Sequence, residues 1–263
     1  MPDWLAVVLL GVIEGITEFI PISSTGHLLI AERWLPRQSD LFNVVIQSGA
    51  VIAVLPLFAG RVNQVLFHWR ERATQVLIAK IFVAFAITGA GGVILEKNNF
   101  QLPEQVAPVA IALIVGGILF IAVEAWLKGR PVSNEVTWIV AIAVGVGQLM
   151  AAIFPGASRS GTTILVAMVL GLSRTSATEF SFLVGIPTML AAGGLKIFKA
   201  IYSPPPGAVP ENWSLLALAT VVSAVISFIA VKWLLRYVQS HTFTGFGWYR
   251  IGLGALILLL VTD

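Results

Sequence analysis

Six stretches of this chain are long, apolar and nearly free of charge, and they constrain the fold more than any other feature. They cover residues 41–60, 75–95, 106–127, 178–195, 213–235 and 247–261. Each reaches or approaches the roughly 20 residues that an α-helix needs to cross a bilayer. Residues 106–123 and 251–261 show no polar face at helical spacing, which a soluble helical bundle would require. We therefore predict an all-α polytopic membrane protein with about six spanning helices.

The composition supports this class and excludes several functions. The chain is 57% hydrophobic and 11% charged, whereas a soluble domain usually carries about 25% charged residues. It contains no cysteine, which excludes disulfides, thiol catalysis and thiolate metal sites. Its net charge of +3 is explained by basic loops, so we expect no nucleic-acid partner.

Two further apolar stretches, 4–20 and 136–154, are each interrupted by a polar break. The first break runs from Pro21 to His27 and the second from Pro155 to Thr163, and a short helical piece follows each. Lipid cannot satisfy non-helical backbone, so such breaks are tolerated only where protein or water covers them. We interpret both stretches as re-entrant helix hairpins, whose breaks together indicate a binding site near the membrane midplane.

The two halves of the sequence match each other. Four positions of the first half correspond to four of the second at a constant offset of 134 residues: Gly11, Glu14, Pro21 and Ser24 with Gly145, Gln148, Pro155 and Ser158. This indicates an internal duplication, approximately 1–130 and 131–263, within one membrane domain spanning 1–263. With three spans and one hairpin in each copy, the odd number of spans would make the two repeats inverted.

The basic residues divide between two predicted sides of the membrane. One side carries Arg61, Arg70, Arg72, Lys128, Arg130, Arg174, Lys232 and Arg236, and the other carries Arg33, Arg37, Lys97 and Lys199. The positive-inside rule places the larger set in the cytoplasm. Both termini, and the opening of the site, are then expected on the outer side.

Glu14 and Glu18 are candidate site residues because they precede the first break. Their spacing of four puts them on one helix face. Carboxylates inside a membrane segment are costly and are functional by default, whereas two glutamates at a wet surface would do nothing. Together they could bind Mg²⁺ or Ca²⁺ through oxygen ligands. Alternatively, one of them could act as a general base.

The first break offers hydroxyls and a histidine. Ser23, Ser24 and Thr25 precede a new helix, where Ser and Thr are ordinary N-caps. The same position is also an anion site, because free N–H groups and the helix dipole point at it. Gly26 would let a ligand approach the backbone closely. Ser24 with His27 would be a minimal nucleophile and base.

The second break supplies an arginine among hydroxyls. Arg159 offers a planar fork of donors that suits a phosphate, and Ser158, Ser160 and Thr163 flank it. An arginine at membrane depth needs an anionic partner. That partner is either a ligand or a glutamate of the first hairpin, and the two are compatible. The combined inventory favours phosphoryl transfer on a lipid-borne phosphate.

These motifs resemble a known family. The runs Glu14–Glu18, Pro21–His27, Pro155–Thr163 and Phe180–Pro187 are similar to those of the undecaprenyl-diphosphate phosphatases, also called bacitracin-resistance proteins, and the resemblance covers essentially the whole chain. It implies hydrolysis of undecaprenyl diphosphate to undecaprenyl phosphate and inorganic phosphate, which recycles the lipid carrier of cell-wall synthesis in the bacterial plasma (inner) membrane. It also implies bacitracin resistance and a divalent cation, Mg²⁺ or Ca²⁺. The expected partners are this substrate, membrane lipids and, as oligomer, a homodimer.

The resemblance also implies roles for individual residues. Glu14 and Glu18 match the acidic motif, with metal or base roles, Ser24 and His27 match the catalytic hydroxyl and histidine, and Arg159 matches the phosphate-binding arginine. The expected substrate contacts are Ser23, Thr25, Gly26, Ser158, Ser160 and Thr163. The nucleophile stays open between Ser24, His27 and water.

A flippase or transporter of undecaprenyl phosphate is the alternative function. It would use the same phosphate grip and the same broken helices, but it needs no set of nucleophile, base and metal. Because the sequence offers the whole set, we expect an enzyme, with a dual role left open.

Overall fold

The computed structural model describes residues 1–98, 100, 106–203 and 211–260, which form α-helices, one short 3₁₀ helix and no β-strand. The elements are α1 (Asp3–Thr17), α2 (Ser24–Ala31), α3 (Asp40–Val54), η1 (Leu55–Phe58), α4 (Ala59–Phe67), α5 (Arg72–Lys97), α6 (Val106–Leu127), α7 (Trp138–Ile153), α8 (Arg159–Val169), α9 (Arg174–Tyr202), α10 (Trp213–Ser240) and α11 (Thr244–Leu260). The predicted all-α class is confirmed.

Within the described ranges, five segments are long and apolar enough to cross a membrane, so the chain is a multi-pass membrane protein. They are Asp40–Phe67, α5, α6, α9 and α10, and five of the predicted runs lie in or largely within them. Pro56 falls in η1, where its missing N–H breaks the regular helix between α3 and α4. The sixth predicted run corresponds to α11, whose 17 residues fall short of that length. Residue 261 of that run lies outside the described residues.

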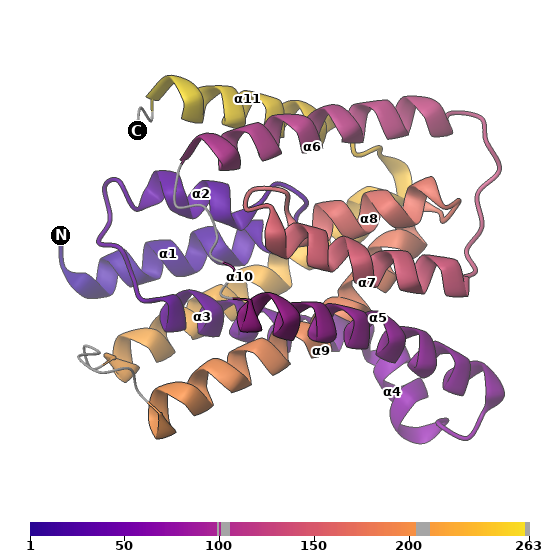
Figure 1. Cartoon of the computed structure of the whole chain (residues 1–263), viewed down its shortest axis with the longest axis horizontal. Helices are drawn as coiled ribbons and strands as arrows, with labels where there is room; N and C mark the ends of the chain where they lie inside the picture. Colours follow the sequence, from indigo (N-terminus) through magenta and orange to yellow (C-terminus); the bar gives the residue numbers. More distant parts are fainter. Residues whose placement is uncertain (99, 101–105, 204–210, 261–263) are drawn as a thin grey trace.

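Both breaks fall between two helices, as predicted, but they are shorter than predicted, because α2 already begins at Ser24 and α8 at Arg159. Helices α1 and α2 contact each other, and so do α7 and α8. Figure 1 shows α1 starting at the end of the molecule where both termini lie, whereas α7 starts at the opposite end. The two hairpins therefore reach the middle of the molecule from opposite directions.

The conformation of the breaks corrects the predicted alignment by one residue. Ser23 and Ser158 have φ of 72° and 68° and are the two non-glycine residues with positive φ in the described chain. Each immediately precedes a helix. Ser158 therefore corresponds to Ser23 and not to Ser24. The offset rises to 135 because the second break holds one residue more, in a turn that includes Gly156 at φ 91°.

Each hairpin packs on the opposite half of the chain. A Cβ at Gly11 of α1 would lie 2.7 Å from the carbonyl oxygen of Ala219 in α10, and one at Gly145 of α7 would lie 2.8 Å from that of Ala84 in α5. Glycine at these positions lets the helix backbones touch, which is the usual way that membrane helices pack closely. The two halves are therefore interlocked, while their inverted relation stays a prediction.

Helices α6 and α11 lie side by side and meet both hairpins (Figure 1). They touch at a pair of glycines, because a Cβ at Gly247 would lie 2.8 Å from the carbonyl oxygen of Gly117. Helix α6 contacts α2 and α8, and α11 contacts α2. The α6–α11 pair therefore packs against the helices that leave the two breaks.

Candidate functional site

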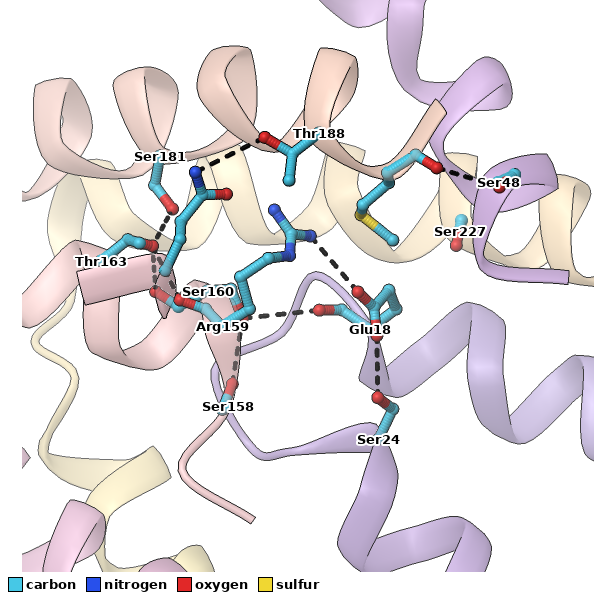
Figure 2. A network of polar contacts seen from close by, with 12 residues as sticks. Glu18, Ser24, Ser48, Ser158, Arg159, Ser160, Thr163, Ser181, Thr188 and Ser227 are labelled. Carbon is cyan, nitrogen blue, oxygen red and sulfur yellow. Dashed lines mark hydrogen bonds and ion pairs between the residues drawn. The ribbon is translucent and has the colours of Figure 1, made fainter. Parts of the chain in front are cut away.

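Glu18 joins the two breaks. Ser24, the first residue of α2, donates its hydroxyl to Glu18 Oε2 at 2.7 Å. Arg159, the first residue of α8, donates from Nη2 to Glu18 Oε1 at 3.3 Å. Figure 2 shows the two side chains approaching the carboxylate from different hairpins. The predicted arginine–glutamate pair is thus formed, and it involves Glu18.

Glu14 lies one turn before Glu18. The Glu18 N–H donates to the Glu14 carbonyl at 3.0 Å, so the two residues share a helix face as predicted. The Glu14 side chain is completely buried, and neither carboxylate oxygen has a hydrogen-bond partner within 3.5 Å. Its polar neighbours are Glu18 and Gln47 of α3, and the positive charge of Arg159 also acts on it. Two neighbouring buried carboxylates require a positive charge or a proton.

This unsatisfied carboxylate fits the predicted divalent cation. Carboxylate and amide oxygens are the ligands that Mg²⁺ and Ca²⁺ prefer, and Glu14, Glu18 and Gln47 offer both kinds. The described residues contain no group of three or more Asp, Glu, His or Cys that could hold a metal. Further ligands would therefore have to be neutral oxygens of the protein, water or phosphate oxygens.

The guanidinium of Arg159 keeps one nitrogen free of protein partners. Nη1 is buried and makes no hydrogen bond. The group lies against Gly185 of α9, where a Cβ would collide with it, and its Cζ is 5.8 Å from the centre of the Phe19 ring. Because a buried guanidinium nitrogen seeks an acceptor, this atom is suited to an anionic ligand.

The hydroxyls of the second break organise the first turn of α8. Ser158 accepts from the Gly161 N–H at 3.2 Å, as an N-cap does, and its hydroxyl is 3.1 Å from that of Ser160. Thr163 donates to the Arg159 carbonyl at 2.8 Å and is 2.5 Å from the Ser181 hydroxyl. These contacts fix the helix turn that carries Arg159 (Figure 2).

The three predicted substrate contacts of the first break, Ser23, Thr25 and Gly26, have different surroundings. The Ser23 hydroxyl is buried without a partner next to Ser24. Thr25 is exposed, and the described residues give its side chain no hydrogen bond. A Cβ at Gly26 would lie 2.8 Å from Cδ1 of Leu113 in α6. Packing against α6 therefore explains this glycine without a ligand.

His27 is oriented by contacts other than Ser24. Its Nδ1 is 2.7 Å from the Ser23 carbonyl oxygen, and its Nε2 is 2.7 Å from the Tyr249 hydroxyl. A carbonyl oxygen only accepts, so Nδ1 carries a proton and Nε2 of the neutral ring accepts from Tyr249. Glu18, and not His27, accepts from Ser24. The minimal pair of Ser24 with His27 is therefore absent from this arrangement.

Comparison with known proteins shows the family of this chain. The profile of the family described as Bacitracin resistance protein BacA matches residues 7–256. The chain belongs to this family. It is 52% identical to the undecaprenyl-diphosphatase of Rhizobium etli (strain CIAT 652), over 99% of this chain and 98% of that protein. It is 47% identical to the undecaprenyl-diphosphatase of Xanthomonas euvesicatoria pv. vesicatoria (strain 85-10), over 98% and 97%.

Several residues around the candidate site escaped the sequence-based prediction. They are Gln47, Gly185, Tyr249 and Arg250. Arg250 carried a usable signal, because a charge inside an apolar run such as 247–261 indicates function. The other three had none, since their importance depends on side chains from distant helices.

Proposed function

We propose that this chain hydrolyses undecaprenyl diphosphate to undecaprenyl phosphate and inorganic phosphate. The names of its full-length relatives support this substrate. The observation that carries the proposal is the contact chain in which Ser24 donates to Glu18 beside an arginine with a free nitrogen. It supplies a nucleophile, a base and a phosphate grip, which are the components that a phosphatase needs.

In the first step, the Ser24 hydroxyl oxygen attacks the terminal phosphorus. Its proton passes to Glu18 Oε2, which already accepts its hydrogen bond at 2.7 Å. The bond between this phosphorus and the bridging oxygen breaks, and undecaprenyl phosphate leaves. Arg159, through the nitrogen that has no protein partner, binds the charge on the transferred group.

In the second step, water hydrolyses the phosphoserine. Before this step, Glu18 releases the proton from Ser24 to the phosphate of the departing lipid and is a carboxylate again. It accepts a proton from the attacking water and returns it to the Ser24 oxygen as the phosphorus–oxygen bond breaks. Inorganic phosphate leaves, and the hydroxyl is restored. Ser24 is preferred to His27 as nucleophile because both imidazole nitrogens are engaged.

The predicted divalent cation is part of this proposal. Glu14 and Glu18 would hold it, with Gln47 as a third oxygen donor. When bound, it would offset the negative charge of the diphosphate. Arg159 already offsets one of the two buried carboxylates by pairing with Glu18, and the cation would offset the charge of the other. The unpartnered oxygens of Glu14 support this assignment.

We further propose an inverted-repeat protein of the bacterial inner membrane whose site opens to the outer side. Ion pairs support the predicted division of charges. Lys199 contacts Glu96 at 2.6 Å, so it lies at the same end as Lys97, the residue after Glu96. Arg61 contacts Glu179 at 2.7 Å, near Arg174 at the start of α9. Lys199 belongs to the set predicted outside and Arg61 to the set predicted inside. Hairpins that start at opposite ends are also typical of transporters, so flipping of undecaprenyl phosphate stays the alternative. The homodimer stays a prediction.

Phosphate release from undecaprenyl diphosphate tests the function. The purified protein in detergent is assayed with Mg²⁺, with Ca²⁺ and with EDTA. Arg159→Ala is compared with Arg61→Ala, a control whose ion pair lies at the surface. We expect cation-dependent release that collapses only in Arg159→Ala. Absence of release from folded wild-type protein under every condition would refute the phosphatase and favour the transporter.

A further inference from the structure

Arg250 in α11 is a buried charge with an unusual set of partners. Its side chain has no exposed surface, and the described residues offer it no ion pair. Instead, the guanidinium donates to five backbone carbonyl oxygens, those of Pro21 at 3.2 Å, Ala112 at 3.4 Å, Leu113 at 3.4 Å, Gly156 at 3.1 Å and Ala157 at 2.9 Å. Burying a charged guanidinium without an anionic partner costs free energy, so an arginine in this position indicates a role.

The carbonyl partners identify that role. Pro21 lies in the first break, Gly156 and Ala157 lie in the second, and the other two belong to α6. The structure gives the carbonyls of Pro21 and Gly156 no other donor, because the helices before them have ended. At membrane depth such groups have no water to turn to. One side chain therefore satisfies backbone groups of both breaks.

The surrounding helices leave a slot for the guanidinium. A Cβ at Gly116 of α6 would collide with its Nη2, and a Cβ at Gly161 of α8 would lie 3.0 Å from its Nη1. Any larger residue at Gly116 would displace the group. The planar fork reaches the five carbonyls through one contact of Nε, one of Nη1 and three of Nη2, whose two N–H groups are therefore shared. A lysine offers three donors from one point and could not reach all five.

We propose that Arg250 is a positioning residue that ties the two breaks to each other and to the α6–α11 pair. Ser24 begins the helix after the first break, and Arg159 begins the helix after the second. The distance between nucleophile and phosphate grip is therefore set by how the breaks sit relative to each other. Arg250 fixes that relation without touching the substrate. The catalytic part of this inference rests on the proposed phosphatase function.

The absence of cysteine from the chain makes the relation between the breaks measurable. Cysteines introduced at Ile16 and Phe154, which are exposed and flank the two breaks, can carry spin labels. Electron–electron double resonance then gives the distribution of distances between the hairpins. Arg250→Met keeps the unbranched part of the side chain as far as the position of Nε and removes every donor. Arg33→Met is the control, because Arg33 donates to a single carbonyl, that of Leu260, at an exposed position.

We call the spin-labelled protein without a further substitution the parent. We expect a narrow distance distribution in the parent and in Arg33→Met, and a broader or shifted one in Arg250→Met. Because misplacement by about 1 Å can cost about 10²-fold in rate, kcat for undecaprenyl diphosphate should fall about 100-fold, with KM changing much less. Arg250→Lys should lie between the two, and it carries the test if Arg250→Met does not fold. A folded Arg250→Lys or Arg250→Met with the parent's distances, or with its kcat, would overturn the proposal. The two proposals can also fail separately. If Arg250→Met changes the distances between the hairpins but the protein without this substitution releases no phosphate, the positioning role of Arg250 stands and the phosphatase function is refuted.

Discussion

Gly185 offers a test of the site that removes no functional group. A Cβ at this position of α9 would collide with Nη1 of Arg159 and would lie 2.9 Å from its Cζ. Carbon atoms prefer a separation of about 3.5–4.0 Å. In Gly185→Ala the guanidinium must therefore withdraw from its slot by at least about half an ångström.

The consequence for activity should be large. The hydrogen bond from Arg159 to Glu18 is already 3.3 Å long, so it has little tolerance for displacement. A displaced guanidinium also presents its free nitrogen in the wrong place. Loss of one donor to a developing charge costs about 10²–10³-fold in kcat, or about 2.7–4 kcal/mol. Because the displaced atoms are the end of a flexible side chain, and alanine favours a helix over glycine by roughly 0.5–1 kcal/mol, folding should be nearly unaffected.

Gly194→Ala is the matched control, because Gly194 lies in the same helix and a Cβ there would meet nothing within 4 Å. Phosphate release and thermal unfolding are measured for both variants in detergent. We expect both to unfold near the wild-type temperature and only Gly185→Ala to lose activity. If folded Gly185→Ala released phosphate as fast as Gly194→Ala, the assignment of Arg159 as the phosphate grip would be wrong.

Three other changes test the remaining roles. Ser24→Ala should lower kcat at least about 10³-fold, since a lost nucleophile is rarely replaced. It should also form no phosphoenzyme from substrate labelled in its terminal phosphate. If the Ser24→Ala protein became labelled, Ser24 would not be the nucleophile. Glu14→Gln should raise the cation concentration for half-maximal activity at least about tenfold, by analogy with weakened metal sites. In EDTA, Glu14→Gln should be no less stable than wild type, because the wild-type carboxylate has no hydrogen-bond partner to lose. An unchanged dependence of activity on cation concentration would exclude Glu14 as a ligand. Tyr249→Phe removes the donor to His27 Nε2. Because neither residue takes part in the proposed steps, kcat should fall by less than about fivefold, the equivalent of about 1 kcal/mol. A larger fall would show that His27 takes part in catalysis.

The sequence by itself determined the elements of this protein. Apolar length identified the five spans that the described residues contain, although it also suggested a sixth at α11. The interruptions after residues 20 and 154 identified the hairpins, because the cost of unpaired backbone in lipid leaves few alternatives. The spacing of Glu14 and Glu18 fixed their common face, since helical periodicity is a local property. These inferences depend only on neighbours along the chain.

Only the tertiary structure decided which side chains meet. Glu18 pairs with a residue 141 positions away. It also accepts the hydrogen bond of Ser24, whereas closeness in the sequence had suggested His27 as the partner of Ser24. The repeat register shifted by one at Ser158 because a turn at Gly156 absorbed an extra residue. Arg250 reached both breaks only because α11 packs on α6 through paired glycines. Periodicity gives the direction of a side chain within its own helix, whereas the distance to another helix depends on packing that no local pattern encodes.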